Sequence, residues 1–128
     1  MRDLRWKCEE KGCFRNLCPM LGAFDDCFPG KIGMSDVDGV VEISGHFLFL
    51  EWKAEGGSVS TGQRIMYERL TALSDKMTVI VVNGHPRTME IKQVQVYRAG
   101  KGGPFEACSF DELKMRMKCW VARVRSNG

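Results

Sequence analysis

The chain has 128 residues, of which 44% are hydrophobic and 27% charged, and its formal net charge is +3. This length is enough to bury a core without disulfides or a metal as a condition for folding, so we expect a single domain over residues 1–128. The longest apolar runs, such as MTVIVV, are too short to cross a membrane, and MRDLRWKCEE at the start lacks the hydrophobic segment of a signal peptide. We therefore expect a soluble, cytoplasmic protein with no membrane partner.

The charge is uneven along the chain. Residues 1–64 hold 8 Lys/Arg and 10 Asp/Glu, whereas residues 65–128 hold 11 Lys/Arg and 6 Asp/Glu. A half with net charge −2 therefore precedes a half with net charge +5. This asymmetry is compatible with an acidic site served by a basic docking surface, but it also fits ordinary solvated faces.

The first regular elements are expected after an irregular start. Residues 1–12 predict a short helix, and the Gly, Pro and Asp residues that follow predict irregular chain to about residue 35. VDGVVEI (37–43) and HFLFLEWK (46–53) are β-branched or aromatic runs separated by Ser44-Gly45. Such runs with so compact a connection predict an antiparallel hairpin.

Side chains are expected to alternate along the second strand of this hairpin, because successive residues of a strand point to opposite faces. One face then carries Phe47, Phe49, Glu51 and Lys53, and the other carries Leu48, Leu50 and Trp52. A carboxylate and an ammonium group therefore follow two aromatic rings on the same side of the sheet.

A helix and a buried strand come next. EGGSVSTGQ predicts a glycine-rich loop in which Ser60 or Thr61 caps a helix over residues 62–74. MTVIVVNG (77–84) predicts a central strand buried on both faces. A strand, a helix and a second buried strand indicate a crossover with parallel pairing. The apolar stripe of the helix is expected to be Ile65, Met66, Leu70 and Leu73.

The last third predicts an edge strand and a long helix. IKQVQVYRAG (91–100) alternates apolar and polar residues and predicts an edge strand, followed by the loop GKGGPFEAC. A basic helix covers about residues 109–125, opened by Ser109 or Asp111. Its expected stripe is Phe110, Leu113, Met117, Trp120 or Val121, and Val124. Together the elements predict an α/β fold with a mixed β-sheet flanked by helices.

Carboxylates gather around the hairpin. Asp36 and Asp38 are two residues apart and share a face that the hairpin would bring beside Glu51 and Lys53. Mutual repulsion among carboxylates is costly unless a cation neutralises it. Mg²⁺ suits this place, because it takes oxygens from one or two carboxylates and completes its shell with water and substrate phosphate. We expect Mg²⁺ or Mn²⁺ on Asp38 and Glu51, with Asp36 and the carbonyl oxygen of Trp52 as further ligands.

Lys53 would then orient or help to deprotonate an attacking water and offset charge on a phosphate. A divalent ion lowers the pKa of water and polarises a phosphoryl oxygen, which is what hydrolysis of a phosphodiester requires. These residue types in this order therefore indicate metal-dependent nuclease chemistry.

Residues 31–83 contain an Asp, a spacer of 12 residues, Glu-Trp-Lys, a Ser/Thr-Gly-Gln helix start and a hydrophobic strand, in this order. With these motifs the stretch resembles the PD-(D/E)xK nuclease superfamily. Within the superfamily the stretch looks most like the VRR-type (virus-type replication-repair) nucleases and the Holliday-junction resolvases. The first acid of the family pattern maps to Asp36 or Asp38, although Ser35 stands where the family usually has proline. The second acid maps to Glu51, the lysine to Lys53 and the helix glutamine to Gln63.

This resemblance implies a restriction-endonuclease-like fold and a Mg²⁺-dependent endodeoxyribonuclease, one that nicks DNA or cuts branched DNA in a phage or replication and repair context. We expect a homodimer, because a chain this small has little surface for gripping a duplex. The alternative is a nuclease-fold module that binds DNA or protein without cutting. The candidate DNA-binding residues are Arg64, Lys114, Lys118, Arg123 and Arg125.

Six cysteines are many for this length, and without a secretory signal they are read as thiols or metal ligands. Cys8, Cys13, Cys18 and Cys27 are spaced by five, five and nine residues and lack a CxxC knuckle. They could still converge on a structural Zn²⁺. Free thiols that pack as small hydrophobic side chains are the alternative.

Overall fold

A computed structural model describes residues 19–127 of the chain. The chain divides into two compact units, Met1–Asp36 and Val37–Gly128. The helix expected over residues 1–12 lies outside the described residues, and the single domain stays a prediction. Among the residues that are described, no helix combines the length and the apolar character needed to cross a lipid bilayer.

The described part of the first unit contains one short 3-10 helix, η1 (Leu21–Cys27). None of its residues is buried, and Pro29 and Gly30 follow it, Gly30 with a φ of 61° that glycine adopts without strain. The irregular chain expected here is therefore interrupted by a single short helical segment.

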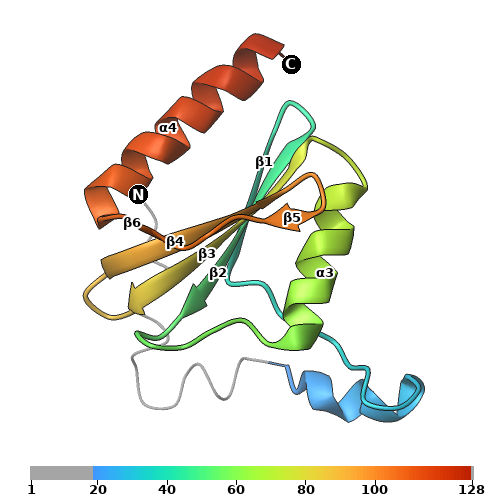
Figure 1. The fold of residues 1–128 in the computed structure, drawn as a ribbon. Coiled ribbons are helices and arrows are strands. Elements are labelled where there is room, and N and C mark those ends of the chain that lie inside the picture. Colours follow the sequence, from blue (N-terminus) through green and yellow to red (C-terminus); the bar gives the residue numbers. More distant parts are fainter. Residues whose placement is uncertain (1–18, 128) are drawn as a thin grey trace. The chain divides into compact units, whose positions relative to one another are not determined.

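The second unit is a mixed, open six-stranded sheet with two helices (Figure 1). The strands run in the order β1-β2-β3-β4-β5, and β6 also pairs with β4. β2 and β3 are parallel and joined through α3, and every other strand pair is antiparallel. The predicted hairpin and crossover are confirmed. The elements are β1 (Gly39–Ile43), β2 (His46–Lys53), α3 (Thr61–Ala72), β3 (Met77–His85), β4 (Glu90–Arg98), β5 (Lys101–Gly102), β6 (Glu106–Ala107) and α4 (Phe110–Asn127).

The two helices cover opposite faces of the sheet, as Figure 1 shows. β3 contributes to both cores, since Ile80 and Val82 face α4 whereas Val79 and Val81 face α3. The strand buried on both faces is thereby confirmed. On the α4 face the core is completed by Leu48, Ile91, Val94, Cys108, Leu113, Trp120 and Val124, and on the α3 face by Tyr67 and Tyr97.

The prediction that β4 is an edge strand is wrong. β4 pairs with β3 on one side and with both β5 and β6 on the other, and these two short strands lie in the segment that was expected to be a loop. Gly102 allows β5 to pair with β4, because a Cβ atom at this position would lie 2.6 Å from the ring of Tyr97. Only a residue without a side chain fits against that ring.

Two residues expected in the apolar stripes are exposed. Leu73 is 77% exposed because α3 ends at Ala72, and the buried position of the last turn is taken by Thr71, whose hydroxyl donates to the Tyr67 carbonyl oxygen at 2.8 Å. Phe110 is 38% exposed in the first turn of α4.

The N-terminus of α4 is capped by Ser109 and not by Asp111. The Ser109 hydroxyl accepts from the backbone N–H of Glu112 at 3.1 Å, and the Glu112 carboxylate accepts from the Ser109 N–H at 3.0 Å. This reciprocal pair is a capping box, and it also lowers the pKa of Glu112, through the backbone N–H and then the hydroxyl of Ser109.

Candidate functional site

The candidate site lies at the C-terminal end of β2, in the part of this strand that does not pair with β1. The β1–β2 ladder begins at Gly39, which pairs with Leu50, so the last three residues of β2 pair only with β3. Phe49 packs in the core on the α3 face, and strand alternation puts Glu51 and Lys53 on that same face. The predicted division of side chains between the two faces is confirmed at Leu48, Leu50 and Trp52, which pack on the α4 side.

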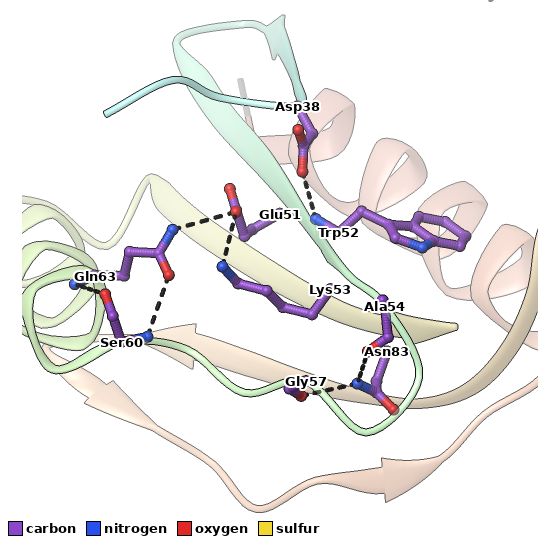
Figure 2. A network of polar contacts seen from close by, with 9 residues as sticks. All are labelled: Asp38, Glu51, Trp52, Lys53, Ala54, Gly57, Ser60, Gln63 and Asn83. Carbon is purple, nitrogen blue, oxygen red and sulfur yellow. Dashed lines mark hydrogen bonds and ion pairs between the residues drawn. The ribbon is translucent and has the colours of Figure 1, made fainter. Parts of the chain in front are cut away.

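Glu51 is the centre of the site. It is only 8% exposed, and a single carboxylate oxygen, Oε1, contacts both the Lys53 ammonium at 3.5 Å and the Gln63 side-chain amide at 3.3 Å (Figure 2). Three residues that the sequence selected as candidates therefore converge at one point, from β2 and from the start of α3.

The orientation of Gln63 follows from the helix cap. The Ser60 hydroxyl accepts from the Gln63 backbone N–H at 3.1 Å, and the Gln63 side-chain oxygen accepts from the Ser60 N–H at 3.2 Å. Because this capping box occupies the amide oxygen, the amide NH₂ group is the part that turns toward Glu51. The residue that caps α3 is thus Ser60 and not Thr61.

Asp38 reaches the same end of β2 from the segment before β1. Its Oδ2 accepts from the backbone N–H of Trp52 at 2.6 Å (Figure 2). The N–H and C=O of one strand residue point to the same edge, so the Trp52 carbonyl oxygen is directed to the edge at which Asp38 lies. The indole of Trp52 is fixed separately, by donating to the Gly84 carbonyl oxygen at 3.1 Å.

The site concentrates negative charge. Burial raises the pKa of Glu51 and the neighbouring charge of Asp38 raises it further, while Lys53 opposes both. Burial, followed by the charge of Glu51, likewise raises the pKa of Tyr67 above its usual range. The Tyr67 hydroxyl is buried close to Glu51 and makes no hydrogen bond of good geometry with any described residue.

Asn83 holds the loop that follows Lys53, and sequence reasoning missed it. Its side-chain NH₂ donates to the carbonyl oxygens of Ala54 and Gly57, each at 2.9 Å, and its oxygen accepts from the Gly56 N–H at 3.4 Å. Asn83 is 2% exposed and lies opposite Lys53 in the parallel ladder. An amide inside an otherwise apolar run was the signal that could have pointed to it.

The remaining candidates belong to other elements of the chain. Asp36 is an exposed residue of the first unit, and Arg64 on α3 forms an ion pair with Glu68 at 3.0 Å. The four basic candidates of α4 belong to the helix on the opposite face of the sheet from Glu51, with the Lys114 ammonium 5.5 Å from the centre of the Phe110 ring. These basic candidates are Lys114, Lys118, Arg123 and Arg125.

Metal ligands are few in the described part of the chain. Residues 19–127 contain no group of three or more His, Cys, Asp or Glu side chains placed to hold an ion, which leaves the two carboxylates of Asp38 and Glu51. Cys27 is an exposed free thiol in η1, whereas Cys8, Cys13 and Cys18 lie outside the described residues. The zinc site stays a prediction.

Comparisons with known proteins found no matching family model, no matching curated protein and no matching solved structure.

Proposed function

We propose that this chain is a metal-dependent DNA endonuclease with a PD-(D/E)xK-type site, acting in replication or repair or in a phage, within the cytoplasm. The observation that carries the proposal is the convergence of Lys53 and Gln63 on one oxygen of the buried Glu51. The sequence pattern assigned these residues to one site without any knowledge of their distances, so the pattern and the distances support the proposal independently. The mixed sheet with a helix on each face is compatible with the fold that the resemblance implies.

The donor set suits a hydrated Mg²⁺ or Mn²⁺. Asp38 and Glu51 supply two carboxylates, the Trp52 carbonyl oxygen is directed to the same edge, and water and substrate phosphate would provide the other ligands. The raised pKa of Glu51 fits a site that a bound cation would stabilise. The Tyr67 hydroxyl, which makes no hydrogen bond of good geometry with the described residues, could bond to the ordered water of such an ion. When bound, the ion would polarise the phosphoryl oxygen and lower the pKa of water.

The side chains of the chain itself would position the reactants. The Lys53 ammonium, 23% exposed, can exchange its contact with Glu51 for the scissile phosphate and offset the charge that develops there. Water would attack the phosphorus atom and give up a proton to the solvent, the phosphorus–oxygen bond to the leaving strand would break, and the released oxygen would take up a proton from the solvent. Gln63 would hold the Glu51 carboxylate in place through its amide.

A cleavage assay tests this proposal. The purified chain would be incubated with supercoiled, linear and four-way-junction DNA, with Mg²⁺, Mn²⁺ or a chelator. We expect metal-dependent cutting that falls by at least about a hundredfold in Glu51→Gln and in Lys53→Gln, since each removes a charge from the reacting centre. Cutting of the junction alone would assign branched DNA as the substrate.

The matched controls come from a second Glu–Lys pair. Glu55 and Lys92 form an exposed ion pair outside the proposed catalytic set, so Glu55→Gln and Lys92→Gln should cut as fast as the natural chain. Cutting that survives in Glu51→Gln would mean a contaminant or a different site. DNA binding with no cutting under any metal would instead support the non-catalytic module.

We also propose that the active form is a homodimer, because two copies would offer a larger surface for gripping a duplex and one such site for each strand. Light scattering coupled to size-exclusion chromatography should give twice the 14.5 kDa mass of the chain, at least when DNA is present. A monomer bound to DNA would contradict this part of the proposal.

A further inference from the structure

A cleft lies between α4 and the sheet, on the face opposite Glu51. Its volume is about 490 Å³, and its walls are mainly apolar. This volume falls within the range of about 300–1,000 Å³ that is typical of small-molecule sites. The walls include Leu48 and Ile80 from the sheet and Leu113, Met117 and Trp120 from α4.

Three arginines line the same cleft. Arg98 comes from the end of β4, and Arg116 and Arg123 come from α4. Arg98 and Arg123 also line a neighbouring cavity of about 250 Å³, together with His46 and Asp75. Positive charge is therefore concentrated where the two cavities adjoin.

The positive charge exceeds what nearby carboxylates neutralise. Glu106 pairs with Arg116 at 3.1 Å, but within the described residues neither Arg98 nor Arg123 makes an ion pair, and Asp75 lies beyond ion-pair distance of both. Arg98 is exposed as a whole residue, but partial desolvation beside the apolar walls lowers its pKa, and the charges of Arg123 and Arg116 lower it further. The guanidinium groups still remain charged, because arginine does not lose its proton in proteins. Like charges held together against apolar walls would gain free energy from an anion.

We propose that this cleft binds a small organic anion, a phosphate or carboxylate group carried on an aliphatic or aromatic body. Arg98 and Arg123 would hold the charged group, for which the planar guanidinium offers paired donors. The body would lie along Trp120 and Leu113. Mainly apolar walls favour such a ligand over a DNA backbone, which carries a phosphate at every step. This inference does not depend on the proposed nuclease activity.

Binding can be tested with the full chain and the fluorescent probe 8-anilinonaphthalene-1-sulfonate, an aromatic anion. We expect saturable binding of one probe per chain. Displacement by decanoate would support a carboxylate ligand, and displacement by phenyl phosphate a phosphate ligand. Inorganic phosphate should be at least about tenfold weaker than the better competitor, because it lacks the apolar body. Failure of both organic competitors, or equal displacement by inorganic phosphate, would overturn the proposal.

Arginine variants locate the charged group. Arg98→Gln and Arg123→Gln should each weaken probe binding about tenfold, which corresponds to about 1.4 kcal/mol. Arg125→Gln is the matched control, because Arg125 is exposed on the same helix but does not line either cavity. Circular dichroism would check folding of each variant, and Arg123, which is exposed like Arg98, gives the answer if Arg98→Gln fails to fold. Equal weakening by Arg125→Gln would contradict the assignment.

Nuclear magnetic resonance separates this cleft from the candidate nuclease site. Addition of the better competitor should shift the indole N–H signal of Trp120 and leave the side-chain amide signal of Gln63 unchanged. Shifts at Gln63 without shifts at Trp120 would place the anion at the nuclease site and overturn the proposal.

Discussion

Replacing Asn83 by alanine would remove the three hydrogen bonds that hold the loop after β2. The two bonds to the carbonyl oxygens of Ala54 and Gly57 are both 2.9 Å long and are each worth about 1 kcal/mol, and the longer bond from Gly56 adds less. The loop backbone is exposed, so water can satisfy its freed groups and the full desolvation penalty does not apply. We expect the free energy of unfolding to fall by about 2–3 kcal/mol.

Urea denaturation followed by far-ultraviolet circular dichroism would measure this loss. Asn83→Asp should cost at least as much, because its carboxylate cannot donate and would face two carbonyl oxygens. Gln93→Ala is the control, since Gln93 is the β4 partner of Asn83 and its side chain makes no comparable bonds within residues 19–127, and it should change stability by less than about 0.5 kcal/mol. A loss below about 0.5 kcal/mol in Asn83→Ala would refute the reasoning, because the loop would then be held by other contacts.

Three further substitutions test the packing around the site. Glu51→Gln should raise the free energy of unfolding at pH 7 in the absence of divalent metal. The pKa of Glu51 is raised in the folded chain, so the ionised carboxylate opposes folding at any pH above that pKa. The gain in stability should therefore shrink as the pH falls toward about 4, which urea denaturation at both pH values would show. Tyr67→Phe should stay within about 0.5 kcal/mol of the natural chain in the same assay, because its hydroxyl makes no hydrogen bond of good geometry with the described residues, and a larger loss would mean that its contact with Glu51 stabilises the fold. Gly84→Ala should lower the free energy of unfolding by about 1–3 kcal/mol, because the new Cβ atom would lie 2.3 Å from the Glu90 carbonyl oxygen. Gly62→Ala is the control and should not lower it, because no atom lies within 4 Å of the position of its Cβ. Equal thermal midpoints for the two variants would contradict this reasoning.

Strong local patterns predicted the elements that form the site. Ser44-Gly45 between two apolar runs predicted the hairpin, and strand alternation alone placed Glu51 and Lys53 on one face. The glycine-rich loop that ends in Ser60 and Thr61 predicted the helix start, although the sequence left both residues open as caps. Each of these features depends on residues close together in the chain.

Features set by distant residues could not be predicted. β5 and β6 have two residues each, too few to show a strand pattern, so β4 was assigned to an edge. The apolar stripe of α3 was predicted from hydrophobic residues alone, yet its buried residues are Tyr67 and Thr71. Both carry a hydroxyl group, so a hydrophobic pattern does not include them. The partners of Asn83 depend on the parallel register between β2 and β3, which the sequence does not encode locally.

Manganese binding tests the central claim most directly, namely that Asp38 and Glu51 form one cation site. Electron paramagnetic resonance of Mn²⁺ titrated into the full chain, without DNA, counts bound ions independently of cutting. We predict one Mn²⁺ per chain that Mg²⁺ displaces, with binding lost in Asp38→Asn and in Glu51→Gln and kept in Asp36→Asn. Unchanged Mn²⁺ binding in both Asp38→Asn and Glu51→Gln, or no binding by the natural chain, would contradict the account.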